Sequence, residues 1–141
     1  MLCQKEAKVI HKIAYFLLLL LFLAGCAQNE KGVQIQNDTN EDIEEAEQLF
    51  EKDDRLSSAV AIFHENEILS GVTVKTFSRF HKAKIEEELK KKLEKLYENF
   101  EITVSADNKI ILETKKLMEL EEKDKLTQKI KDLKTLSEEE T

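Results

Sequence analysis

The chain has 141 residues, of which 29 are acidic and 22 basic, and its formal net charge is −7 at pH 7. This length allows one small domain, and the acidic excess argues against nucleic acid as a ligand, because phosphate backbones repel a negative surface. The three glycines form neither a phosphate-binding loop nor a dinucleotide fingerprint.

The first part of the chain has the layout of an export signal. Three lysines precede an apolar run over residues 13–23, and a charged start followed by a short apolar segment is typical of a secretory signal peptide. A transmembrane anchor is the alternative. Even with residues 24–27 counted, the apolar stretch is only about fifteen residues long, whereas about twenty are needed to span a bilayer. We therefore expect residues 1–25 to be a signal peptide.

The apolar run closes on Leu-Ala-Gly-Cys at residues 23–26, which resembles the lipobox of bacterial lipoproteins. The resemblance implies a diacylglyceryl group on the Cys26 sulfur and cleavage between Gly25 and Cys26. Two acyl chains hold a protein stably on a membrane where a single chain does not. The expected partner is therefore the membrane, and the expected location is the extracytoplasmic face of a bacterial cell membrane.

Processing changes the composition of the chain that remains. Cleavage removes Cys3, Lys5, Glu6, Lys8 and Lys12, which leaves a net charge of about −9. Because Cys26 would carry the lipid, no thiol is left for a disulfide, a metal site or a nucleophile. Residues 26–41 are polar and have no apolar period, so we expect a flexible tether there.

The next segments predict a helix and a β-hairpin. Residues 42–52 have apolar side chains at helical spacing, and residues 58–63 and 68–75 are rich in β-branched side chains and predict two antiparallel strands. In the second strand one face is expected to be core and the other partly wet. The core face carries Ile68, Val72 and Val74, and the partly wet face carries Leu69, Gly71, Thr73 and Lys75.

The longest predicted helix follows, and then a third strand. Apolar residues recur every three or four positions from Ile85 to Phe100, the period of one buried stripe. Residues 101–105 predict a strand. Residues 109–112 fit either a fourth strand, which the local pattern favours, or the start of a helix capped by Ser105 or Asp107. No glycine or proline would interrupt such a helix toward Leu133.

These elements predict an α+β fold: a three-stranded sheet, made of the hairpin and a third strand after a crossover helix, with helices on one face and a long C-terminal helix. The apolar stripe near the C-terminus either packs on its own domain, which is favoured, or pairs as a coiled coil with a protein partner or a second copy. Its members are Leu117, Leu120, Leu126, Ile130 and Leu133.

Three segments together, residues 58–75, the lysine-rich helix and residues 100–107, resemble the YhcN/YlaJ type of sporulation lipoprotein. The resemblance covers residues 42–118, and residues 119–141 form a charged helical extension that departs from the family. The resemblance implies residence on a forespore or spore membrane and a part in spore formation, germination or outgrowth. It also implies a helix after Ser105, and it carries no catalytic residues over to this chain.

The residues themselves predict no catalytic site, no metal site and no cofactor. His64 stands beside Glu65 but lacks the second histidine of a zinc-binding helix, so residues 64–67 are interpreted as a solvated hairpin turn. His81 has no ligand neighbour and is expected in the loop or first turn of the long helix. Two hypotheses remain: a non-enzymatic, lipid-anchored interaction protein, which is favoured, and a small accessory enzyme of the cell wall, which would need histidine and acidic residues converging in a cleft.

Overall fold

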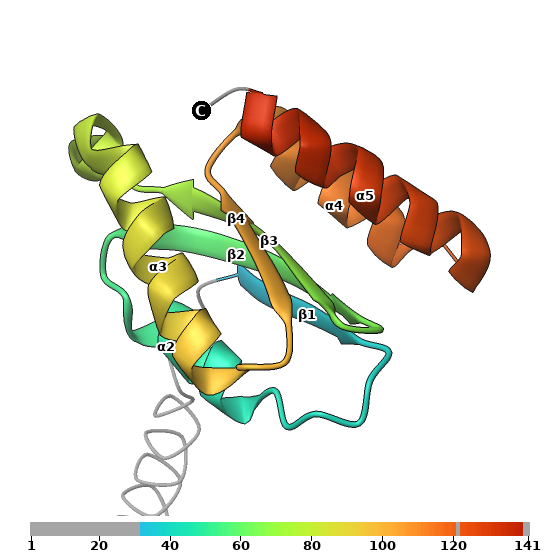
Figure 1. The fold of residues 1–141 in the computed structure, drawn as a ribbon. Coiled ribbons are helices and arrows are strands. Elements are labelled where there is room, and N and C mark those ends of the chain that lie inside the picture. The colour runs from blue at the N-terminus through green and yellow to red at the C-terminus, as the bar shows by residue number, and fades with distance from the viewer. Residues whose placement is uncertain (1–31, 121, 140–141) are drawn as a thin grey trace, which may run out of the picture.

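The computed structural model describes residues 32–120 and 122–139, and within them the chain forms a four-stranded mixed sheet with helices on both faces (Figure 1). The predicted α+β class is confirmed. The strands are β1 (Gly32–Asn37), β2 (Leu56–His64), β3 (Glu67–Val74) and β4 (Glu101–Ser105). The helices are α2 (Glu44–Lys52), the short 3-10 helix η1 (Thr76–His81), α3 (Lys82–Leu96), α4 (Asn108–Met118) and α5 (Lys123–Glu139).

The strand order β1-β2-β3-β4 gives the sheet two distinct ends. β1 runs parallel to β2, β2 and β3 form the predicted antiparallel hairpin, and β4 runs parallel to β3. Gly32 pairs with Ser58, and Ser58 pairs with Thr73. The start of β1 therefore lies beside the end of β3, and we call this the entry end of the sheet. The opposite end, which carries the β2–β3 turn, is called the hairpin end.

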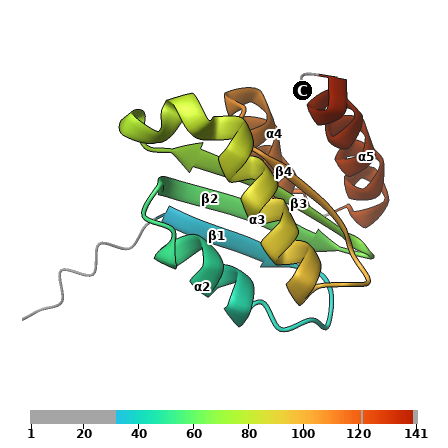
Figure 2. The same ribbon diagram turned by 60° about the vertical axis from the view of Figure 1, so that its left-hand side comes forward.

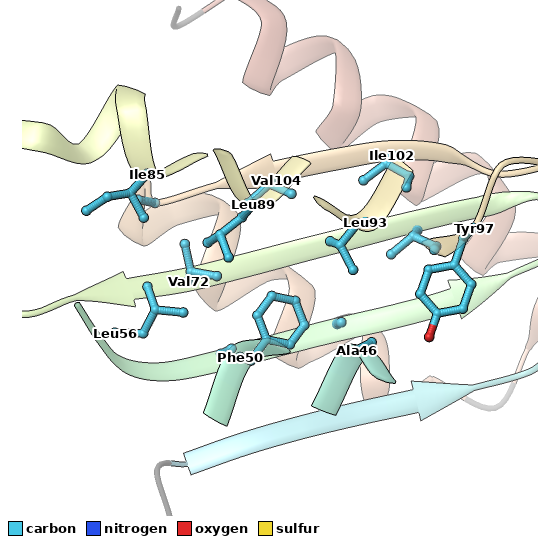
Figure 3. Close-up of a cluster of buried hydrophobic side chains, with 14 of the residues drawn as sticks. Ala46, Phe50, Leu56, Val72, Ile85, Leu89, Leu93, Tyr97, Ile102 and Val104 are labelled. Carbon is cyan, nitrogen blue, oxygen red and sulfur yellow. The ribbon is translucent and has the colours of Figure 1, made fainter. Parts of the chain in front are cut away.

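The first core lies between the sheet and the helices α2 and α3 (Figure 3). α3 contributes Ile85, Leu89 and Leu93, each fully buried and spaced one helical turn apart, as the sequence pattern predicted. α2 adds Ala46 and Phe50 from its apolar stripe. These helices thus cover the face of the sheet that the sequence assigned to the core.

The count of three strands is wrong, because β1 is a fourth strand within the segment predicted to be a tether. Val33 and Ile35 alternate with polar residues and pack against the first core. An edge strand buries only one of its faces, so two apolar residues are enough to hold it once β2 supplies the hydrogen bonds. A pattern this short has no recognisable period in the sequence alone.

The second face is also covered, which corrects the one-sided arrangement of helices. The face of β3 that was predicted to be partly wet is buried at Leu69 and Gly71, while Thr73 is half-buried and Lys75 is exposed. Leu69 is 1% exposed and packs with Ile62 under α4 and α5. At Gly71 an added Cβ would stand 3.0 Å from the Cα of Ile111, so the missing side chain lets α4 approach the sheet closely. The sequence signal for this second layer lies far along the chain, in α4 and α5.

The open choice at residues 109–112 is settled as helix. The Asp107 side chain accepts hydrogen bonds from the backbone N–H groups of Lys109 and Ile110, which is an N-cap. The predicted C-terminal helix is present as α5, but the possible continuous helix from Asp107 toward Leu133 is not, because α4 ends at Met118 and α5 begins at Lys123. One helix over both would be about 48 Å long, and a strand of nine residues such as β2 spans about 30 Å. Folding back keeps both apolar stripes on the sheet.

Candidate functional site

The turn between β3 and α3 carries two phenylalanines that lie almost entirely in solvent. Phe77 is 96% exposed and Phe80 is 95% exposed, while Phe50 and Phe63 are fully buried in the first core. Both exposed rings belong to η1, and residues three apart in a 3-10 helix lie on the same side. Exposed apolar groups placed together mark contact sites more often than isolated ones do.

Positive charge surrounds these rings. The segment carries Lys75, Arg79, Lys82 and Lys84, and no aspartate or glutamate lies between Glu67 and Glu86. Together with Phe77 and Phe80 these four cations are called the aromatic–basic turn. Within the part of the chain that the structure describes, the side chains of Lys75 and Arg79 make no ion pair. Lys84 Nζ lies 3.9 Å from Glu88 Oε1 and Lys82 Nζ donates to the Ala106 carbonyl at 3.0 Å, so the unpaired charges of the turn are those of Lys75 and Arg79.

Two cations of the turn lie at the end of α3 where the helix dipole disfavours positive charge. The first turn of α2 is acidic, with Glu44, Glu45 and Glu47, and this arrangement suits the positive N-terminal end of the helix dipole. α3 has no acidic residue in its first turn and begins instead with Lys82 and Lys84. Cations at a helix N-terminus are unfavourable, so the helix dipole does not account for the two lysines, although Lys84 also pairs with Glu88 one turn along α3 at 3.9 Å.

The aromatic–basic turn projects from the entry end of the sheet. It follows Val74 at the end of β3, and the register places this end beside the start of β1. Figure 2 shows the turn before α3 and the start of β1 on the same side of the molecule, at the left of the view. The chain segment that leads back to Cys26 therefore joins the domain at the end that carries the exposed rings.

An ion-pair network holds the base of this end together. Arg55 binds Asp53 through Nε and Nη2, at 2.8 and 2.6 Å, and binds Glu88 through Nη1 at 2.6 Å. The hydrogen bonds from the Arg55 guanidinium hold the pKa of Asp53 and the pKa of Glu88 below their usual values. The Arg55 carbonyl also accepts the Lys75 N–H at 2.8 Å. The network thus links the loop before β2 to α3 and to the first residue of the aromatic–basic turn.

A second cluster lies at the hairpin end and corrects the interpretation of His64 as part of a solvated turn. His64 is 5% exposed, with Nδ1 lying 3.3 Å from Asp38 Oδ2 and Nε2 lying 2.8 Å from Thr127 Oγ1. Thr127 Oγ1 also lies 3.3 Å from Glu65 Oε1 and from the Lys123 carbonyl. β1, the hairpin and α5 meet at this imidazole, which sequence spacing could not reveal.

The order Asp38, His64, Thr127 matches the contacts of a hydrolase triad, but the surroundings of the hydroxyl differ from such a site. Thr127 lies in the second turn of α5, where its own N–H and that of the next residue are committed to the helix, so no pair of backbone donors for an oxyanion stands directly beside its hydroxyl. A carboxylate, a carbonyl and an imidazole all compete for its single hydroxyl proton. The geometry therefore suits a bond that holds α5 to the sheet.

The described residues contain no group of three or more His, Cys, Asp or Glu side chains placed to hold a metal ion. Gly25 and Cys26, the predicted cleavage and lipidation positions, lie outside the described residues.

His81 is the last residue of η1 and is exposed, in agreement with its expected place before the long helix. The aromatic–basic turn was not predicted, although two phenylalanines three residues apart among cations are a visible signal in the sequence.

No protein-family model matches the chain, and the searches of curated proteins and of solved structures found no match. The resemblance to sporulation lipoproteins stays a prediction. No helix between residues 32 and 139, position 121 aside, has the length and apolar character needed to cross a bilayer.

Proposed function

We propose that this protein is a non-enzymatic, lipid-anchored protein of a bacterial membrane surface. The observation that carries the proposal is the short distance between the predicted lipid and the folded domain. Since β1 begins at Gly32, six residue steps separate it from Cys26, and a fully extended chain covers at most about 20 Å over that length. A diacylglyceryl group on Cys26 would hold the entry end of the sheet close to the bilayer.

The predicted lipobox, the apolar run before it and its lysine-rich start support the lipid anchor. A domain tied this closely to a membrane acts on the surface or next to it, whereas a long flexible tether would let it explore the wall. The resemblance to the YhcN/YlaJ type further suggests a forespore or spore membrane and a part in spore formation, germination or outgrowth.

The anchor is tested by comparing the wild-type chain with Cys26→Ala in a bacterial host. We expect the wild-type protein in the membrane fraction, labelled by a fatty-acid probe, and the variant unprocessed and unlabelled. Wild-type protein that takes up no label would contradict the proposal. Gly32→Ala, which leaves the lipobox intact, is the matched control.

The sporulation role needs a separate test. A fluorescent reporter fused to the C-terminus is followed through growth and sporulation of the host. Signal confined to the forespore or spore membrane supports the role. Uniform envelope signal in growing cells would contradict it while leaving the lipid anchor in place.

A second candidate function is a small accessory enzyme of the cell wall. The contacts among Asp38, His64 and Thr127 at the hairpin end favour it, because histidine and acidic residues do converge there, beside a surface hollow. Its test is turnover of purified wall fragments by the wild-type chain and by His64→Gln. Activity that is lost in the variant while the fold is retained would replace the non-enzymatic proposal.

A further inference from the structure

We propose that the aromatic–basic turn is a second membrane contact, in which Phe77 and Phe80 enter the headgroup region of an anionic bilayer and Lys75 and Arg79 pair with lipid phosphates. This inference takes from the proposed function only the assumption that the nearby surface is a bacterial membrane. The contact itself needs no lipid on Cys26, so the two proposals can fail separately.

The apolar part of the contact comes from the two rings. At 96% and 95% exposure they meet almost nothing within their own chain, and their spacing of three in η1 directs them to one side. Aromatic side chains next to lysine and arginine are typical of segments that lie in the interface of a membrane, where the rings leave water and the cations stay at the headgroups.

The cationic part is local, and the overall acidic charge does not cancel it. Charges more than about 8 Å apart are largely screened at physiological ionic strength, so the bilayer is influenced chiefly by the residues nearest to it. Carboxylates near this end already have partners: Asp53 and Glu88 pair with Arg55. Glu86 accepts the Ala106 N–H, Glu87 pairs with Lys91, and Asp107 caps α4. Each lysine or arginine next to an anionic surface strengthens binding about fivefold.

The arrangement of charge along the sheet gives the molecule an orientation. β1 ends at the hairpin end, and the acidic segment between β1 and the first turn of α2 follows it there. This segment carries Asp38, Glu41, Asp42, Glu44 and Glu45. An anionic bilayer therefore attracts the entry end and repels the opposite end. The chain leading to Cys26 joins the domain at the attracted end, which places the rings on the side that faces the lipid.

A second copy of the chain is the other occupant that fits, since the acidic hairpin end is complementary to the aromatic–basic turn. Such a contact joins different surfaces of the two copies and would form an open head-to-tail chain. The membrane is favoured because Cys26 lies within about 20 Å of the start of β1, which keeps this end at the bilayer.

The contact is tested with the chain from residue 26 carrying Cys26→Ser, so that no lipid is attached. Both cores are built from residues between Val33 and Leu136, so this chain contains the whole described fold. Its binding to vesicles of phosphatidylglycerol and phosphatidylcholine is compared with binding to phosphatidylcholine alone. We expect binding to the anionic vesicles only.

Matched variants separate the two parts of the contact. The pair Phe77→Ala and Phe80→Ala should weaken binding at least about tenfold, whereas Leu112→Ala, at a 55% exposed site on α4, should leave it unchanged. The pair Lys75→Gln and Arg79→Gln should weaken it at least about tenfold at low salt. Lys129→Gln with Lys131→Gln, the same loss of charge at exposed sites on α5, should not.

The chain has no tryptophan, so Phe77→Trp gives a single fluorophore in the turn. Its emission should shift to the blue on anionic vesicles and be quenched by brominated lipid, while Leu112→Trp should show neither change.

Three results would overturn the inference: no binding to anionic vesicles, equal binding of the phenylalanine variants and the wild-type chain, or self-association in solution that the phenylalanine variants abolish. Vesicle binding without acylation of Cys26 in cells would contradict only the proposed function.

Discussion

Gly71 shows how closely a single residue fixes the second layer of the fold. Its position in β3 lies under α4, and a Cβ there would stand 3.0 Å from Ile111 Cα and 3.2 Å from Val60 Cγ2. Because the nearest atom belongs to backbone, α4 would have to move away from the sheet to make room. The absence of a side chain, which is usually unfavourable in a strand, is therefore required here.

We expect Gly71→Ala to lower the free energy of unfolding by about 1 to 3 kcal/mol, the range for overpacked cores. Gly32→Ala is the matched control, since its nearest neighbour would be Ser58 Cβ at 3.7 Å, an ordinary contact. Urea denaturation of the two variants measures the difference. Equal stability of both would contradict the close approach of α4.

Thr127 is the residue that joins α5 to the buried imidazole of His64. Thr127→Val keeps the shape of the side chain but leaves His64 Nε2 without its partner at 2.8 Å. We expect a loss of about 1 to 2 kcal/mol in unfolding free energy, the cost of an unsatisfied buried group. Thr135→Val provides the comparison, because Thr135 Oγ1 makes the same bond to the fourth carbonyl before it, at an exposed site. Similar losses in denaturant unfolding would mean that the histidine contact adds nothing.

Asp53 makes the folding stability of the protein depend on pH. Its pKa in the folded protein is lowered from 3.8 by hydrogen bonds from Arg55, so the ionised form is stabilised by folding. This stabilisation is present above the pKa of the unfolded chain and is lost as the pH falls through the lower folded value.

We therefore expect Asp53→Asn to cost about 1 kcal/mol at neutral pH and progressively less below about pH 4. Denaturant unfolding across that range measures it. Glu51→Gln, an exposed change in the last turn of α2, two residues before Asp53, is the control and should have little effect at either pH. A cost for Asp53→Asn that stays constant from neutral to acid would contradict the role assigned to the Arg55 pair.

At the scale of elements, α5 belongs to the domain. Leu126, Ile130 and Leu133 are 1%, 2% and 8% exposed and pack with Ile62 and Leu69 of the sheet. These are side chains of the stripe that could also have formed a coiled coil. Packing on the domain, the favoured alternative, is the arrangement found, and a pairing through the same residues would require α5 to leave the sheet.

Ile130→Ala tests this packing. We expect it to lower the unfolding free energy by about 2 to 4 kcal/mol, as for other truncations in a core. Leu112→Ala should change it by less than about 0.5 kcal/mol, because that side chain is largely in solvent. A small effect of Ile130→Ala in a chain that remains monomeric would show that α5 is loosely held.

The elements that the sequence predicted well are those with a strong internal period. The stripe of Ile85, Leu89 and Leu93 and the β-branched run of β2 each fit one structure and no other. β1 was not predicted because two apolar residues make no period, and its stability comes from pairing with β2. The burial of His64 was not predicted either, because its partners lie 26 and 63 positions away in the sequence.

On the scale of the whole molecule, the two ends of the sheet differ in charge and in exposed apolar surface. The entry end carries exposed rings and cations and receives the chain from Cys26. The hairpin end carries the acidic segment before α2 and the His64 cluster. We propose that a lipid on Cys26 and this distribution of charge would together hold the entry end against an anionic membrane and direct the hairpin end away from it.

Intact mass spectrometry of the protein purified from bacterial membranes tests the central claim, the lipid anchor, most directly. The account predicts a mature chain that begins at Cys26 and carries the added mass of a diacylglyceryl group, and an unprocessed precursor for Cys26→Ala. A chain that retains residues 1–25, or one cleaved elsewhere with an unmodified Cys26, would contradict it.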